Sequence, residues 1–283
     1  MKSKLLPILL AGACLNQARA DFNPVALTPG SYTYDIVVES NAPGALPFCI
    51  NATTGSGTSE GDNTYFEQGY YAQPGQAGGN LGVPVHNTVF TNINNANVTF
   101  QMPPVVATNN TLQLDTGLPS ASFDVNSGLS FQSLAVLEGG SGPGSVTYTV
   151  THSDASVDTG TLSISDWFTP AGIQIAWGCN ARVNNGGGFD VRSTSAVNNV
   201  YPYLYSYYIT IAHAAPITNI TFNYTGSHEA NFYSVSGEVV GGTTWAPVSI
   251  GGWNRMTTVP AIVPPPTTAT MDSGTNNTGN TWF

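Results

Sequence analysis

The sequence predicts an all-β protein whose strands form an antiparallel β-sandwich. Short runs alternate apolar and polar residues, Gly, Pro, Asn and Ser separate these runs, and no segment from Asp21 onward carries the apolar stripe and caps of a helix. Apolar residues make up 41% of the 283 residues and charged residues only 8%, which suits a folded core. Because strands with one apolar face need a second sheet to cover them, a sandwich of the jelly-roll type follows.

The clearest strand is the run from Val146 to His152, in which Val146, Tyr148 and Val150 alternate with threonines. The glycine-rich run from Glu138 to Gly144 lacks the G-x-S-x-G spacing of a nucleophile elbow and predicts a hairpin turn. In chain order, the predicted strands are residues 32–38, 97–102, 111–114, 146–152, 159–163, 204–212, 217–224 and 231–235.

Residues 1–20 are predicted to be a secretory signal. Lys2 and Lys4 form its basic start, residues 5–15 are largely apolar, and Ala18-Arg19-Ala20 is a small-residue cleavage site. The apolar stretch is shorter than the roughly 20 residues that span a bilayer, so we expect a secreted, extracellular or cell-surface protein without membrane insertion. The alternative is a lipoprotein signal, in which Cys14 would carry a lipid anchor.

Removal of the signal leaves a chain without lysine. Its basic residues are then Arg182, Arg192 and Arg255, and these three stand against 16 acidic residues, a net charge near −13. Binding to nucleic acid depends on neutralising phosphates with Lys and Arg, so nucleic acid is excluded as a partner. Anionic membrane surfaces are disfavoured for the same reason. Uncharged glycans and divalent cations remain open.

Two cysteines remain in the mature chain, and an even pair in an exported protein predicts a disulfide between Cys49 and Cys179. The acidic residues Glu60, Asp62 and Glu67 have two interpretations. One is a structural calcium site with backbone carbonyls, since calcium prefers hard oxygen ligands. The other is a solvated turn.

No catalytic residue is assigned, because no catalytic constellation stands out in the sequence. The four histidines, His86, His152, His213 and His228, show no metal-ligand spacing and are predicted to be structural. His152 closes one predicted strand, and His213 directly follows another.

Aromatic residues beside polar ones are the candidate ligand contacts. Sugar rings stack their C–H faces on aromatic side chains while their hydroxyls bond to Asp, Asn or Arg. The alternative is that these aromatics fill the sandwich core, which needs large apolar side chains. The predicted ligand-binding residues are Asp166, Trp167, Trp177, Arg182 and Tyr205.

Internal similarity divides the chain. Phe22-Asn23-Pro24-Val25 is matched by Trp245-Ala246-Pro247-Val248, and Asn63-Thr64-Tyr65-Phe66 by Asn280-Thr281-Trp282-Phe283. We therefore expect one complete domain over residues 21–242 and the start of a truncated second repeat over 243–283. The alternative for 243–283 is a flexible tail rich in Pro, Thr and Asn.

The chain resembles the galactose-binding-like or jelly-roll β-sandwich repeats of large secreted bacterial surface proteins. The matching features are the run from Gly61 to Tyr70, Ser165-Asp166-Trp167-Phe168, Arg182, Tyr203-Leu204-Tyr205 and the run from Tyr233 to Gly237. The resemblance implies a β-sandwich, export and further copies of the same domain. Tyr203 stands where a basic or polar residue is expected in that family.

Three functions follow as hypotheses. The first is a non-catalytic module that binds carbohydrate or another cell-surface polymer, with weak sites that gain avidity by repetition. The second is a structural or adhesive spacer, which requires the aromatic residues to be buried. The third is a polysaccharide-degrading enzyme, a glycoside hydrolase or lyase, that uses Asp166 or Glu67.

Overall fold

A computed structural model describes residues 22–38, 52–54, 63–69, 82–104, 109–169, 172–179, 181–184, 188–191 and 202–240. The chain divides into two units, Met1–Thr244 and Trp245–Phe283, and all described residues belong to the first. The predicted signal and the predicted second repeat lie outside the described residues. No helix in the described ranges is long and apolar enough to cross a membrane.

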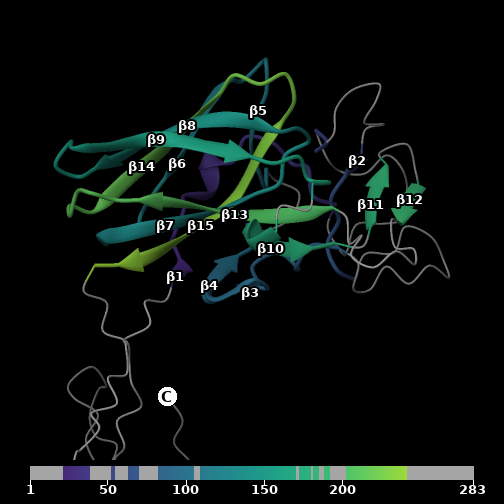
Figure 1. The fold of residues 1–283 in the computed structure, drawn as a ribbon, viewed down its shortest axis with the longest axis horizontal. Coiled ribbons are helices and arrows are strands. Elements are labelled where there is room, and N and C mark those ends of the chain that lie inside the picture. The colour runs from purple at the N-terminus through teal and green to yellow at the C-terminus, as the bar shows by residue number, and fades with distance from the viewer. Residues whose placement is uncertain are drawn as a thin grey trace, which may run out of the picture. The chain divides into compact units, whose positions relative to one another are not determined.

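The described residues are nearly all β, as predicted, and two sheets pack as a sandwich (Figure 1). An eight-stranded sheet has the order β10-β13-β7-β15-β1-β4-β3, with β5 paired to β15. A four-stranded sheet has the order β6-β14-β8-β9 and covers one face of the first. A three-stranded sheet, β12-β11-β2, completes the set.

The strand bounds are as follows: β1 Phe22–Pro24, β2 Asn63–Thr64, β3 Val89–Asn92, β4 Asn95–Gln101, β5 Leu112–Leu114, β6 Ser120–Asp124, β7 Phe131–Glu138, β8 Gly144–His152, β9 Val157–Ile164, β10 Ile175–Gly178, β11 Ala181–Asn184, β12 Gly188–Val191, β13 Tyr203–Thr210, β14 Ile217–Tyr224 and β15 Ala230–Val239. Two short 3-10 turns, Pro29–Ser31 and Gly172–Gln174, are the helical elements of the described chain.

Seven of the eight predicted strands are found. The exception is 32–38, which makes only isolated bridges, from Tyr34 to Thr111 and from Val38 to Phe66. The alternation of apolar and polar residues that predicted β8 and β14 corresponds to a buried face and a more exposed face of each strand. Val146, Val150, Ile220 and Phe222 are buried against the larger sheet, while the intervening threonines are more exposed.

The core between the two sheets is rich in aromatic residues. Tyr203, Tyr205 and Tyr207 alternate along β13 and are all buried there, as is expected of residues that share one face. Phe222 of β14 stacks on Phe232 of β15, with ring centroids 4.2 Å apart. This contact joins the two layers directly.

The other face of the larger sheet is covered because the sheet curls on itself. The backbone N–H of Ile93, after β3, donates to the carbonyl of Ala176 in β10 at 3.0 Å, so the two ends of the strand order meet. A second core fills the curl, and its largest members include Tyr65, Trp167, Phe100 and Tyr233. Much of β15, the second half of β7 and the first five residues of β13 are therefore buried on both faces.

The run from Glu138 to Gly144 is not the predicted hairpin turn. It joins β7 of the larger sheet to β8 of the smaller one, so it carries the chain between layers. Gly140 makes this crossing possible: an added Cβ would lie 2.2 Å from the carbonyl oxygen of Glu229. Only glycine fits at so close an approach.

Candidate functional site

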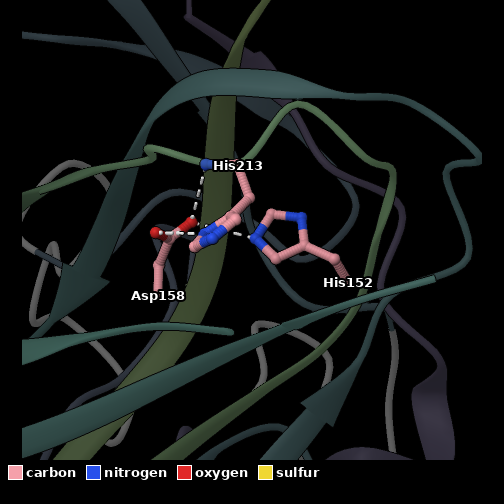
Figure 2. A group of neighbouring side chains, drawn as sticks. All are labelled: His152, Asp158 and His213. Carbon is pink, nitrogen blue, oxygen red and sulfur yellow. Dashed lines mark hydrogen bonds and ion pairs between the residues drawn. The ribbon is translucent and has the colours of Figure 1, made fainter. Parts of the chain in front are cut away.

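The structure brings two histidines and an aspartate together at one end of the four-stranded sheet (Figure 2). His152 is the last residue of β8, and Asp158 is the second residue of β9. The hairpin between them is closed by the backbone N–H of His152, which donates to Ser156 O at 3.0 Å, and by Ala155 at a φ of 67°. His213 lies in the loop between β13 and β14.

Asp158 bonds to both imidazole rings. Its Oδ2 lies 2.9 Å from His152 Nε2, and its Oδ1 lies 2.8 Å from His213 Nδ1. The ring centroids of the two histidines are 5.6 Å apart. Figure 2 shows the two rings and the carboxylate converging, with dashed lines from Asp158 to both histidines. The candidate ligand atoms all lie within 4.8 Å of one another.

Backbone groups fix the orientation of this cluster. His152 Nδ1 lies 2.7 Å from the carbonyl oxygen of Ala215 and can only donate to it, so Nδ1 carries a hydrogen. The backbone N–H groups of Ala212 and His213 both donate to Asp158 Oδ2, at 3.3 Å. The loop between β13 and β14 therefore holds both the ring of His152 and the carboxylate of Asp158.

Asp158 is ionised at neutral pH. Its burial alone would raise the pKa of the carboxyl, but hydrogen bonds from His213, from His152 and from the two backbone N–H groups outweigh this, and the net effect lowers the pKa. The cluster thus holds a fixed negative charge between two imidazoles. The side chain of His152 is fully buried, whereas that of His213 is 45% exposed.

The predicted ligand-binding residues occupy a different part of the fold, and two of them are core residues. The side chains of Trp167 and Tyr205 are both 0% exposed, so neither offers a ring face to a sugar in this structure. Trp167 packs edge-on against Tyr65, and the Tyr205 hydroxyl donates to the carbonyls of Asp166 and Thr169. Tyr205 lies in the core between the sheets and Trp167 in the core inside the curl of the larger sheet, and a ligand role for either residue stays a prediction.

The other three predicted ligand contacts are engaged within the protein. The Arg182 guanidinium lies 4.6 Å from the ring centroid of Phe168 and 5.5 Å from that of Trp167, and the residue is buried. Trp177 is half-buried and donates its Nε1 hydrogen to Gly82 O at 3.1 Å. Asp166 Oδ1 accepts the backbone N–H of Phe168 at 2.7 Å, which forms the turn after β9.

The predicted calcium ligands are only partly described. Glu67 is 2% exposed, and its carboxylate meets His86, whose Nδ1 lies 2.8 Å from Oε1 and whose backbone N–H donates to the same oxygen at 2.7 Å. Glu60 and Asp62 lie outside the described residues, so the structure does not test the calcium site. The Glu67–His86 pair contributes to holding the segment before β3.

The predicted disulfide is not formed in the structure. Cys179 is a free, buried thiol beside Trp167 and Leu204 in the second core cluster, and burial raises its pKa. Cys49 lies outside the described residues. The pairing of Cys49 with Cys179 stays a prediction.

Glu138 is the most deeply buried carboxyl in the described part of the chain. It is 0% exposed at the end of β7, and its Oε1 accepts the backbone N–H of Gly140 at 2.7 Å. Burial raises the pKa of Glu138 well above its usual range; backbone N–H groups of Gly140 and Asn231 offset part of this, and the charge of Asp166 adds to it. Burial therefore favours the protonated form of Glu138.

Sequence reasoning missed the His152–Asp158–His213 cluster. The signal that exists is topological: His152 ends one strand and His213 follows another, and such ends meet only once the strands are paired correctly. Asp158 directly precedes the predicted strand 159–163 and carries no motif of its own. Spacing along the chain could not reveal the cluster, since His152 ends β8 whereas His213 lies in the loop that joins β13 of the larger sheet to β14 of the smaller one.

No family model matches this chain, and no curated protein matches it. The resemblance to galactose-binding-like repeats therefore stays a prediction.

Proposed function

We propose that this chain is a non-catalytic β-sandwich module of an exported repeat protein, and that its role is that of a structural or adhesive spacer. The observation that carries the proposal is the burial of the aromatic residues. Apart from Ile36, the largest fully buried side chains of the described part are all aromatic: Trp167, Tyr65, Tyr205, Tyr224, Tyr233, Phe66, Phe100, Phe123, Phe222 and Phe232.

This use of aromatic residues distinguishes a spacer from a sugar-binding module. A binding module needs rings whose faces are open to solvent. Here the rings fill two cores, one between the sheets and one inside the curl of the larger sheet. Tyr65 contacts both Trp167 and Tyr233 edge-on, which is a packing arrangement of a core.

The internal similarity supports a tandem arrangement. In the first copy, the repeated residues have structural roles: Phe22-Asn23-Pro24 is β1, which pairs with β15, and Tyr65 and Phe66 are fully buried. A sequence match at such positions keeps the residues on which the fold depends. β15 ends at Val239, so the segment matching β1, which starts at Trp245, follows it by only five residues. The sequence that matches β1 thus begins directly after the closing strand of the first copy.

A glycan array tests the spacer role. The purified protein should retain no glycan at millimolar concentrations, with or without a chelator, because its described aromatic residues are largely buried. Retention of one glycan class that free sugar competes away would contradict a spacer role.

Carbohydrate binding is the second candidate, and one observation favours it. Tyr208 of β13 is 44% exposed, its hydroxyl accepts a hydrogen bond from Asn95 Nδ2 at 2.9 Å, and the edge of its ring meets Phe22 at 5.7 Å. An open ring beside an amide is suited to a sugar. If a glycan is retained on the array, Tyr208→Ala should abolish retention, while Phe168→Ala, away from this surface, should not.

A further inference from the structure

The hydrogen-bonding groups of the His152–Asp158–His213 cluster require an unusual placement of hydrogens on the ring of His152. His152 Nδ1 carries a hydrogen, because the Ala215 carbonyl at 2.7 Å can only accept. In a neutral imidazole the other nitrogen, Nε2, then has a bare lone pair. That lone pair faces an oxygen of Asp158 at 2.9 Å. Two electron-rich atoms at this distance repel unless a positive charge lies at them.

The surroundings do not supply that charge from another side chain. Asp158 contacts His152, His213 and two backbone N–H groups, and in the described structure no Lys or Arg is within ion-pair distance of it. Two sources of positive charge remain, a second proton on His152 or a bound metal ion. A metal ion is the source that the geometry favours, because two imidazole nitrogens and a carboxylate oxygen lie within 4.8 Å of one another.

We propose that His152 Nε2, Asp158 and His213 Nδ1 bind a divalent transition-metal ion of the zinc class. Two imidazoles and one carboxylate are the ligands that zinc and its neighbours prefer, whereas calcium and magnesium prefer oxygen alone. This site differs in position and in chemistry from the calcium site predicted at Glu60, Asp62 and Glu67.

The groups around the cluster are those expected around a metal site. Metal-binding histidines commonly donate their second N–H to a backbone carbonyl, which fixes the tautomer, and His152 does so to Ala215 O. Metal-binding carboxylates are in turn held by hydrogen bonds, as Asp158 is by Ala212 and His213. The donor atoms of His152 and Asp158 are therefore oriented before any metal arrives.

The geometry leaves room for adjustment and for one more ligand. Zinc bonds nitrogen at about 2.0–2.1 Å, which spaces tetrahedral ligand atoms roughly 3.3 Å apart, so the histidine nitrogens now 2.8 and 2.9 Å from the Asp158 oxygens must shift slightly to admit the ion. His213 is the ligand best placed to move, because it lies in a loop and is 45% exposed. Three protein ligands leave the fourth tetrahedral position to water or to a group from outside. Bound metal would tie the β8–β9 hairpin to the β13–β14 loop.

Cobalt titration of the metal-stripped full chain tests the proposal. We expect one equivalent of Co²⁺ to bind, with the visible absorption of a four- or five-coordinate nitrogen and oxygen site, and Zn²⁺ to displace it. Calcium should not compete. Saturating Zn²⁺ should raise the Tm by about 5 °C or more, because it binds the folded state alone.

Matched variants assign the site. His213→Ala and Asp158→Asn should each weaken Co²⁺ binding about 100-fold or more, since even outer partners of a metal contribute 10–100-fold. His213→Ala removes a half-exposed loop side chain and should keep the metal-free Tm, so it serves where a His152 variant fails to fold. His228→Ala removes an imidazole outside the cluster and should bind Co²⁺ normally.

Three results would overturn the proposal. One is the absence of saturable Co²⁺ and Zn²⁺ binding, with a doubly protonated His152 in the ¹⁵N spectrum of the metal-free protein; the cluster would then be a buried imidazolium–carboxylate pair. The second is normal binding by His213→Ala. The third is a loss of Co²⁺ binding in His228→Ala as large as that in His213→Ala. None of these depends on the spacer or glycan role, which the array measures separately.

Discussion

The ring of Phe222 in β14 stacks on the ring of Phe232 in β15, with centroids 4.2 Å apart and planes within 10°. Both side chains are fully buried, and each comes from a different sheet. The pair therefore marks the middle of the sandwich, where the four-stranded layer meets the larger one.

Phe222→Ala should destabilise the protein by about 3–5 kcal/mol, because it removes a buried ring and leaves a cavity between the sheets. Denaturant unfolding followed by circular dichroism measures this. Thr221→Ala, one residue away on the more exposed face of β14, should cost no more than about 1 kcal/mol. Equal costs for both variants would mean that the two sheets do not pack through this face.

Glu138→Gln should change how stability depends on pH. The pKa of Glu138 is raised in the folded protein, so between its ordinary value and the raised value the folded state holds a proton that the unfolded chain has lost. Wild-type stability contributed by this group therefore falls as pH rises through that window. Glutamine does not titrate, so the stability of the variant relative to the wild type should rise by about 1 kcal/mol or more as the pH increases above the ordinary glutamate pKa of about 4. A parallel pH profile for the two proteins would contradict the burial of Glu138.

Gly140→Ala should be strongly destabilising, by about 1–3 kcal/mol or more. The added Cβ would lie 2.2 Å from a backbone oxygen, Glu229 O, where no side chain can move aside. Gly30→Ala is the matched control, because nothing lies within 4 Å of its added Cβ, and it should cost within about 0.5 kcal/mol of zero. Thermal unfolding of both variants decides whether the crossing from β7 to β8 is as tight as described.

Cys179 should resist alkylation in the native protein and react after unfolding without a reductant. It is 1% exposed, and burial raises the pKa of its thiol, so little reactive thiolate forms. Peptide mapping after iodoacetamide treatment, in the native and in the unfolded state, measures this. If Cys179 stays unlabelled in the unfolded, unreduced chain, the disulfide with Cys49 exists and the description of Cys179 as a free thiol is wrong.

Much of the fold could be predicted from the sequence, because apolar and polar residues alternate along strands that have one exposed face. β14 is found with the predicted bounds, and β8 and β9 differ from theirs by two residues or fewer at each end. β7 was missed because Leu134 to Glu138 are all buried, so that no alternation marks this central strand. The turn at 138–144 was misjudged for a related reason: glycine signals a tight turn but does not say which strands it joins.

The candidate site was harder to predict than the fold. Aromatic residues such as Trp167 and Tyr205 look alike in sequence whether they bind sugar or fill a core, and only the curl of the larger sheet decides between these roles. His152, Asp158 and His213 come together through pairing of β8 with β14 and β9, which no local pattern reveals. In both cases the missing information is long-range register.

The most direct test of the spacer role is the free energy of unfolding of Trp167→Ala, compared with that of Tyr208→Ala. Trp167 is 0% exposed and packs against Tyr65, so its loss should cost about 3–5 kcal/mol. Tyr208 is 44% exposed, so its loss should cost about 1 kcal/mol or less. A Trp167→Ala protein as stable as the wild type would show that this ring is an exposed platform and would contradict the spacer role.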